Sequence, residues 1–160
     1  YKRQLVFRLA FRLLCDEDEA KDMVQETFVK VWLALGKYNG ECRFSTWIYK
    51  ITCNTCYDRL RSLYHSPLDN EADYSVSVNI SSDDNVELAV VNKQLRELIL
   101  RYTDELSPRQ RLIFTLRDIE ELDVPEVQTI TGLSAGIIKT TLYLARKNIR
   151  NKMNQIDAGL

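Results

Sequence analysis

The sequence predicts an all-α protein of two small helical domains joined by a flexible acidic linker. Glycine and proline are scarce, with five and three residues in a chain of 160, and apolar residues recur at helical spacing. The segment "SPLDNEADYSVSVNISSDDN" lacks that spacing and is too polar to bury much apolar surface. We therefore place the first domain at 1–65, the linker at 66–86 and the second domain at 87–160.

The first domain reads as three helices. Apolar residues at helical spacing mark the first of them: Leu5, Val6, Leu9, Leu13 and Leu14. The second helix is predicted from about Asp18 to Leu35, with a buried face formed by Ala20, Met23, Val24, Thr27, Phe28, Val31, Trp32 and Leu35. After the turn "GKYNGECRF", Ser45 is the expected N-cap of a helix that ends near Tyr64. Its predicted buried stripe is Trp47, Ile48, Ile51 and Thr55.

The second domain is predicted to begin with a helix from Val86 to Tyr102. Ser107 followed by Pro108 predicts the start of the next helix, "PRQRLIFTLRDI". Asp123 and Glu126 form a capping pair for a short helix that ends near Thr131. The turn Gly132–Leu133–Ser134 then leads into a last helix, whose predicted core stripe is Ile138, Leu142, Ala145 and Ile149.

The two last helices and their three-residue turn have the pattern of a helix-turn-helix, in which the second helix enters the DNA major groove. The window from Val127 to Ile156 contains no carboxylate and five basic residues, although the whole chain has a formal net charge of -1. A carboxylate in this position would repel phosphate. The outward residues are predicted to be Gly136, Lys139, Thr140, Tyr143, Lys147 and Arg150. The alternative is a solvated basic face on an ordinary helical hairpin.

Two further surfaces carry mixed chemistry. Opposite its core stripe, the second helix has Asp22, Gln25, Glu26, Val29 and Leu33, which suggests a protein contact with an acidic rim. The third helix has Lys50, Asn54, Tyr57, Arg61 and Tyr64 along one side, and cations interleaved with aromatic rings suit single-stranded nucleic acid. The alternatives are harmless exposed aliphatic residues on the one helix and ordinary surface tyrosines on the other.

Several classes of function are disfavoured by composition. No apolar run approaches the roughly 20 residues needed to cross a bilayer, so we expect a cytoplasmic protein with no membrane insertion of its own. The four cysteines, Cys15, Cys42, Cys53 and Cys56, do not form a secreted disulfide framework. Cys53 and Cys56 would need further ligands to bind zinc, and His65 is the single histidine. We therefore expect two small helical side chains there, and no cofactor, metal site or catalytic residues.

Five segments in this order resemble a bacterial extracytoplasmic-function (ECF) sigma factor of the sigma-70 superfamily: "DMVQETFVKVW", "FSTWIYKITCNTCYDRLR", the acidic linker, "LSPRQRLIFTLRD" and "PEVQTITGLSAGIIKTTLYLARKNIR". The resemblance implies that Asp22, Gln25 and Glu26, on the face that also holds Val29 and Leu33, dock on the clamp coiled coil of the polymerase β′ subunit. It implies that Lys50, Asn54, Tyr57 and Arg61 engage the minus-ten promoter element and that the helix-turn-helix reads the minus-thirty-five element and touches the β flap. The residues expected at the minus-thirty-five element are Gly136, Lys139, Thr140, Tyr143, Arg146 and Lys147.

The resemblance further implies a bacterial transcription initiation factor that is not an enzyme and is held inactive by an anti-sigma factor, often a membrane-bound one. Lys139 and Arg146 match the family pattern, whereas Thr141 and Leu144 stand where the family often has arginine. The upstream bases that are read can therefore differ from those of better-known members. The alternatives are a stand-alone helix-turn-helix regulator and, far behind it, a thiol enzyme using Cys53 and Cys56.

Overall fold

The computed structural model describes residues 2–64, 86–103 and 105–159, and these residues form helices without any strand. The helices are α1 (Lys2–Leu14), α2 (Glu17–Ala34), α3 (Phe44–Tyr64), α4 (Val86–Thr103), α5 (Pro108–Phe114), α6 (Val124–Thr131) and α7 (Ala135–Ala158). A short 3₁₀ turn, η1 (Leu35–Lys37), follows α2, and a π-helical turn, η2 (Thr115–Ile119), continues α5. The all-α prediction is confirmed. The linker predicted at 66–86 lies outside the described residues except for Val86, which begins α4.

The helix starts follow from local hydrogen bonds. In α2 the side chain of Asp16 accepts from the amide of Glu19 at 2.9 Å, so the helix begins slightly before the predicted Asp18. The prediction that Ser45 caps α3 is wrong. The amide of Trp47 donates to the carbonyl of Arg43 at 3.0 Å, so the helical hydrogen-bond ladder already includes Ser45.

The predicted caps of the second domain are confirmed. Ser107 and Gln110 exchange both hydrogen bonds of a capping box at the start of α5, and Asp123 and Glu126 do the same at the start of α6. Gly132 ends α6 with a φ of 73°, in the left-handed region that glycine adopts without steric cost. These caps and this turn fix the angle at which α7 leaves α6.

Lobe one (residues 2–64) is a bundle of α1, α2 and α3, and α2 buries most of the predicted stripe. The stripe ends sooner than predicted, because Trp32 is 76% exposed and Leu35 is 44% exposed. Trp32, in the last turn of α2, is one residue or about 100° around the helix from the buried Val31, and Leu35 lies beyond the end of α2 in η1. The prediction that these two residues belong to the core is therefore wrong.

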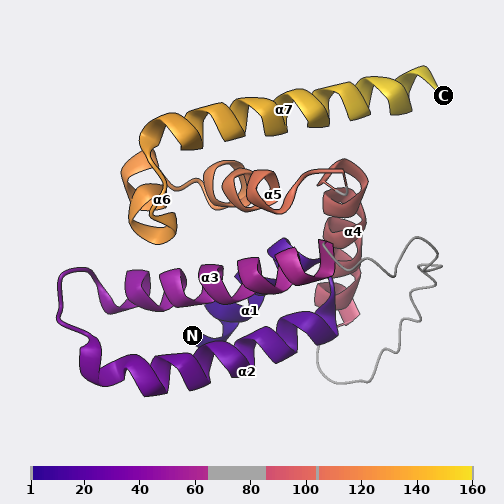
Figure 1. The fold of residues 1–160 in the computed structure, drawn as a ribbon. Coiled ribbons are helices and arrows are strands. Elements are labelled where there is room, and N and C mark those ends of the chain that lie inside the picture. The colour runs from indigo at the N-terminus through magenta and orange to yellow at the C-terminus, as the bar shows by residue number, and fades with distance from the viewer. Residues whose placement is uncertain (1, 65–85, 104, 160) are drawn as a thin grey trace.

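Lobe two (residues 86–159) packs against lobe one rather than standing apart from it. Helix α3 contacts both α5 and α6, and α7 covers α5 on the side that faces away from lobe one (Figure 1). One buried apolar cluster includes residues from both lobes: Leu9, Leu13, Tyr49, Cys53, Leu60, Leu112, Ile113, Leu116, Val127 and Ile130. Burial of this shared cluster stabilises the closed arrangement of the two lobes.

Polar groups also join the lobes. The guanidinium of Arg12 in α1 forms an ion pair with the carboxylate of Glu120, which follows η2. The buried Arg111 in α5 donates to the backbone carbonyl of Leu13 at the end of α1 and to the carbonyl of Thr103. Because Arg12, Arg111 and Glu120 lie largely out of water, each depends on its partner in the other lobe or on backbone carbonyls.

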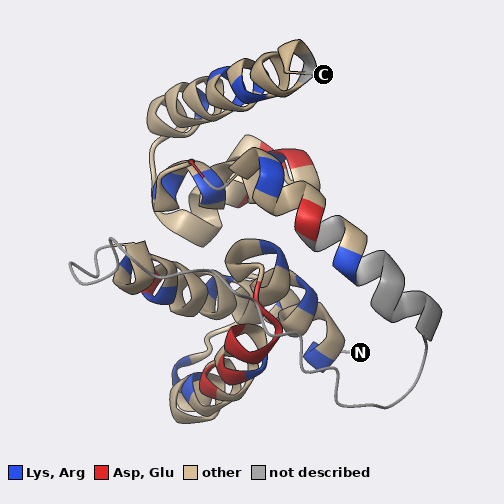
Figure 2. Ribbon diagram, turned by 90° about the vertical axis from the view of Figure 1, so that its right-hand side faces the viewer, with Lys and Arg blue, Asp and Glu red and all other residues tan. Residues whose placement is uncertain are grey.

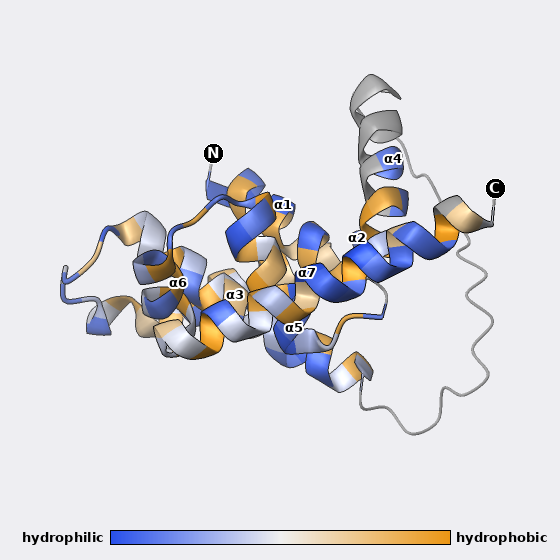
Figure 3. Cartoon of the chain, turned by 90° about the horizontal axis from the view of Figure 1, so that it is seen from above, coloured by the Kyte–Doolittle hydropathy of each residue, from blue (hydrophilic) through white to orange (hydrophobic). Residues whose placement is uncertain are grey.

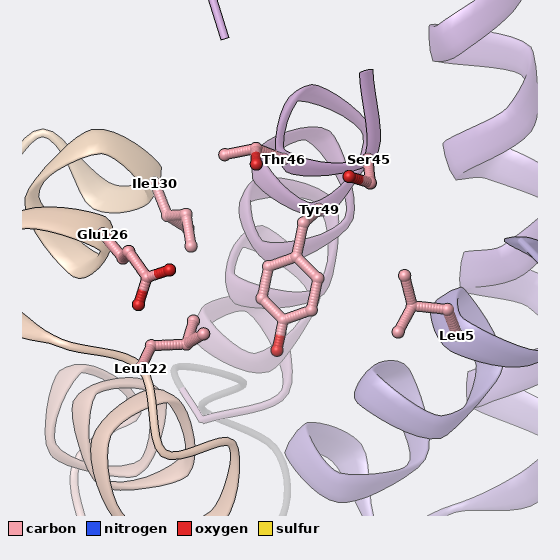
Figure 4. Close-up of a pocket in the computed structure, with 7 residues that line it drawn as sticks. All are labelled: Leu5, Ser45, Thr46, Tyr49, Leu122, Glu126 and Ile130. Carbon is pink, nitrogen blue, oxygen red and sulfur yellow. The ribbon is translucent and has the colours of Figure 1, made fainter. Parts of the chain in front are cut away.

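A pocket of about 140 Å³ lies beside these contacts, between the two lobes. Figure 4 shows the ring of Tyr49 between Leu5 of α1 and Leu122 of lobe two, with Ser45 and Thr46 on the α3 side and Glu126 and Ile130 on the α6 side. Burial raises the pKa of the Tyr49 hydroxyl, with smaller contributions from Cys53 and Glu120. Tyr49 therefore belongs to the contact between the lobes and is neutral near pH 7.

Candidate nucleic-acid and protein-binding surfaces

The helix-turn-helix prediction agrees with the geometry of α6 and α7. Ser134 caps α7 by accepting from the amide of Ile137, and the buried side of α7 includes Ile138, Leu142 and Ala145. Ile149, the fourth residue predicted for that stripe, is partly buried. Since α7 lies on the outer side of lobe two, its opposite side is open to a partner (Figure 1).

The open side of α7 is basic. Gly136, Lys139, Thr140, Tyr143, Arg146, Lys147 and Arg150 are all exposed, as predicted. A groove of about 600 Å³ runs along one flank of the helix, and its lining includes Arg117, Lys139, Tyr143, Lys147 and Arg150. Figure 3 shows that hydrophilic residues continue along the C-terminal half of α7. A basic groove beside an exposed recognition helix suits the phosphate backbone of duplex DNA.

Arg146 has a partner that the sequence pattern did not predict. Its Nε donates to one carboxylate oxygen of Asp118 at 2.8 Å, and its Nη2 donates to the other at 2.5 Å. Hydrogen bonding to Asp118 raises the pKa of Arg146, which is charged in any case. Asp118 belongs to η2, and π-helical turns of this kind re-aim side chains in a helix. The ion pair neutralises part of the charge of Arg146, so Lys139, Lys147 and Arg150 are the stronger candidates for phosphate contacts.

The predicted nucleic-acid side of α3 is only partly open. Lys50, Asn54 and Arg61 are exposed, and so is Tyr64. Tyr57 is half-buried and packs against the apolar cluster shared by the two lobes, so the prediction that it is an exposed residue is wrong in this arrangement. Its ring also lies 5.6 Å from the guanidinium carbon of Arg61. Helical periodicity did not reveal this partial burial, which comes from packing against a cluster that includes residues of both lobes.

The exposed side of α2 extends further than predicted. Asp22, Gln25 and Glu26 are exposed, and Val29 and Leu33 are exposed with them. Trp32 adjoins Val29 and Leu33 on this side, so we define the α2 surface as Asp22, Gln25, Glu26, Val29, Trp32 and Leu33. Figure 2 shows acidic residues gathered along a helix of lobe one, and the first turn of α2 holds Glu17, Asp18 and Glu19. An exposed tryptophan and two aliphatic residues beside acids are typical of a protein-binding surface.

The cysteines of α3 lie in the core rather than at the surface. Cys53 and Cys56 are buried, and burial raises both thiol pKa values, that of Cys56 to about 12. No group of three or more metal-binding side chains occurs among the described residues. Within the same residues, no helix is long and apolar enough to span a membrane. The thiols act as small apolar side chains in the core, as predicted.

The reactivity of the thiols tests whether Cys53 and Cys56 are buried, protonated side chains of the core. We expect iodoacetamide at pH 8 to modify Cys42, which is partly exposed, well before Cys53 or Cys56. The reactive species is the thiolate, and the raised pKa values keep both buried thiols protonated at that pH. Mass spectrometry of peptides from the folded protein, with a guanidinium-unfolded sample as control, measures the difference. Rapid modification of Cys53 or Cys56 in the folded protein would reopen the thiol-enzyme alternative.

Comparison with known families matches both lobes. Residues 1–65 match the family described as Sigma-70 region 2, and residues 96–149 match the family described as Sigma-70, region 4. The chain is 28% identical over 144 residues to the ECF RNA polymerase sigma-E factor of Escherichia coli strain K12, covering 86% of this chain and 75% of that protein. It is 24% identical over 164 residues to the ECF RNA polymerase sigma factor SigW of Bacillus subtilis strain 168, covering 94% and 84% respectively.

Solved structures share the fold over nearly the whole chain. The sigma factor RpoE of Bartonella quintana, in complex with the anti-sigma factor NepR, matches with a TM-score of 0.66 and 21% identity, covering 96% of this chain and 92% of that one. CnrH, in complex with the cytosolic domain of CnrY, matches with a TM-score of 0.65 and 20% identity, covering 95% and 82%. At this level of identity the likeness concerns the arrangement of helices.

Proposed function

The chain belongs to the ECF sigma factors of the sigma-70 superfamily, and on that premise we propose that it binds core RNA polymerase, directs it to specific promoters and assists strand opening. The observation that carries the proposal is the presence of three exposed surfaces of different chemistry on one chain. They are the acidic and apolar α2 surface, the cationic and amide side of α3, and the basic side of α7. A stand-alone regulator would need the last of these but would have no use for the α2 surface.

We assign the α2 surface to core polymerase. Val29, Trp32 and Leu33 would supply the apolar centre of the contact, and Asp22, Gln25 and Glu26 would supply its polar rim. The expected partner is the clamp coiled coil of the β′ subunit. This role accounts for apolar side chains that are left in water in the free chain, where they contribute nothing to the core of lobe one.

We assign the other two surfaces to promoter DNA. Lys50, Asn54, Tyr57 and Arg61 would engage the minus-ten element, where unpaired bases can stack on an aromatic ring. The α7 side would enter the major groove at the minus-thirty-five element, with Lys139 and Lys147 on phosphates and Thr140 and Tyr143 nearer to base edges. Gly136 at the start of α7 leaves room for close approach, and lobe two would also touch the β flap of the polymerase.

Regulation by an anti-sigma factor, either soluble or membrane-bound, is part of the proposal. One solved relative is the sigma factor RpoE in complex with the anti-sigma factor NepR, and the other is CnrH in complex with the cytosolic domain of CnrY. The present chain shares their arrangement of helices, so a similar partner could bind it in the same compact form. Transcription by core polymerase places the site of action in the cytoplasm, and nothing in the proposal requires the chain to be an enzyme.

The polymerase assignment is tested on α2. Replacing Gln25 and Glu26 with alanine is expected to weaken binding to core polymerase roughly tenfold, because each loses a contact at the rim of the surface. Both side chains are exposed, so the free energy of unfolding should change by less than about 1 kcal/mol. Surface plasmon resonance with immobilised core polymerase measures the affinity.

The matched control is Gln94→Ala with Glu97→Ala, which removes the same two side-chain types from exposed positions on α4. This variant should bind core polymerase like the parent. Equal binding by the α2 double variant would contradict the assignment of the α2 surface.

A further inference from the structure

Hydrogen bonds and ion pairs lie on both flanks of the α7 side that faces away from the protein. On one flank Arg146 is held by Asp118. On the other, Asn148 donates to Gln110 at 3.3 Å and Lys152 pairs with Glu105 at 2.7 Å. The buried residues Ile138, Leu142 and Ala145 set the rotation of α7 about its own axis, and these surface contacts agree with it. The side chains between the two flanks therefore point in a defined direction, away from lobe two.

Two of these side chains are aliphatic. Ile137 is 43% exposed and Leu144 is 42% exposed, and they are seven residues apart, which is about two helical turns. They therefore lie on the same side of α7, and we call them the apolar strip. Thr140 lies between them along the helix and is also exposed. The cations Lys139 and Arg150 lie on the opposite flank, with Lys147 near the middle of the exposed side.

A single half-exposed leucine or isoleucine on a protein surface is ordinary. The apolar strip differs because it lies on a helix whose neighbouring cations, along the middle and the opposite flank, would hold DNA phosphates at the major groove. In the groove the strip would be removed from water next to base edges. Neither Ile137 nor Leu144 can donate or accept a hydrogen bond there, and the apolar group that the major groove offers is the C5 methyl of thymine.

We propose that the apolar strip reads thymine, with Ile137 and Leu144 packing against C5 methyl groups in the upstream promoter element. The inference rests on the proposed function, in which α7 enters the major groove, and adds a class of base contact to it. Along α7 the two side chains are separated by roughly 10 Å, which exceeds the rise of about 3.4 Å between successive base pairs. Two thymines at different base pairs can therefore be read together.

The strip fits DNA better than it fits another protein. Specific protein interfaces bury about 800 Å² on each partner around an apolar centre, and two half-exposed aliphatic side chains are too few to form one. The strip also has basic residues beside it and no carboxylate between Val127 and Ile156. A surface with that charge is complementary to the phosphate backbone.

The test uses the full chain assembled with core RNA polymerase and promoter-length duplexes whose upstream half is randomised. After selection with the parent, each thymidine of the enriched upstream sequence is replaced singly by deoxyuridine, which keeps the base-pair hydrogen bonds and lacks the methyl group. Competition binding then compares the two forms. We expect the parent to lose about threefold to fivefold in affinity at one or two positions, as for one buried methyl group.

The variants Leu144→Ala and Ile137→Ala should each bind the thymidine and deoxyuridine forms equally at one of the positions where the parent prefers thymidine. Met153→Ala is the matched control, because Met153 is another half-exposed apolar residue of α7, at 44% exposure, close to its C-terminal end. It should discriminate thymidine from deoxyuridine as the parent does. Lys147→Ala should weaken binding to both forms equally and lower the salt slope by about one.

Three outcomes overturn the inference while leaving the proposed function standing. They are an enriched upstream sequence without thymine, equal affinity of the parent for the thymidine and deoxyuridine forms, and full sensitivity retained in both strip variants. Loss of core polymerase binding in Leu144→Ala, with methyl discrimination intact, would assign the strip to a protein instead. Failure of the parent to enrich any upstream sequence would overturn the proposed reading of DNA by α7 and this inference with it.

Discussion

Replacing Glu120 with alanine is expected to weaken the contact between the two lobes by about 3 kcal/mol, because Arg12 is then left buried without its carboxylate. Both side chains are mostly shielded from water, at 20% and 9% exposure for Arg12 and Glu120. Separation of the lobes would return Arg12 to solvent, so the variant should favour an open arrangement. Small-angle X-ray scattering should show a larger radius of gyration, and hydrogen exchange should speed up in α3 and α6.

The matched control exchanges the charges. Arg12→Glu combined with Glu120→Arg restores an ion pair between the same positions and should recover much of the compact arrangement. Each single exchange places two like charges together and should open the lobes further than Glu120→Ala does. Unchanged scattering and exchange in all single variants would mean that the apolar cluster alone holds the lobes together.

The local features of the fold were predictable because they depend on neighbours in sequence. The capping pairs Ser107–Gln110 and Asp123–Glu126 and the turn at Gly132 each arise from hydrogen bonds or backbone angles within a few residues. The stripes of α2 and α7 follow from helical periodicity. The contact between lobes could not be predicted in this way. Arg12 and Glu120 are far apart in sequence, and neither has a neighbouring residue that indicates its partner.

Features that a regular helical pattern does not contain also explain the wrong predictions for individual residues of the candidate surfaces. Tyr57 has the periodicity of an exposed residue on α3, and its partial burial comes from packing against a cluster to which both lobes contribute. The predicted core stripe includes Trp32, yet this residue lies about 100° around α2 from the buried Val31, beside the exposed Val29 and Leu33. Asp118, the partner of Arg146, lies in a π-helical turn whose altered register is invisible to a pattern based on 3.6 residues per turn.

The second large effect is expected in promoter opening. Asn54 is exposed on α3 and offers both a donor and an acceptor to an extruded base edge, and Tyr57 could stack on an unpaired base. One stacked base is worth roughly 1–3 kcal/mol, so Tyr57→Ala should lower the yield of open complex about fivefold or more. Tyr57 is half-buried against the cluster shared by the lobes, so stacking on a base requires its ring to move away from that cluster. Neither Asn54 nor Tyr57 can make its contact while the duplex is closed.

We therefore expect Asn54→Ala and Tyr57→Ala to assemble with core polymerase and to form closed complexes nearly as the parent does. Permanganate footprinting of unpaired thymines should show less open complex on duplex promoters and partial recovery on templates with a pre-melted bubble. Tyr57→Phe keeps the aromatic ring and serves as the control, so it should open the duplex almost as well as the parent. Because Asn54 is not part of the contact between lobes, its variant separates base recognition from lobe closure. Equal permanganate reactivity of Asn54→Ala, Tyr57→Ala and the parent on the duplex would show that this side of α3 does not engage the melted strand.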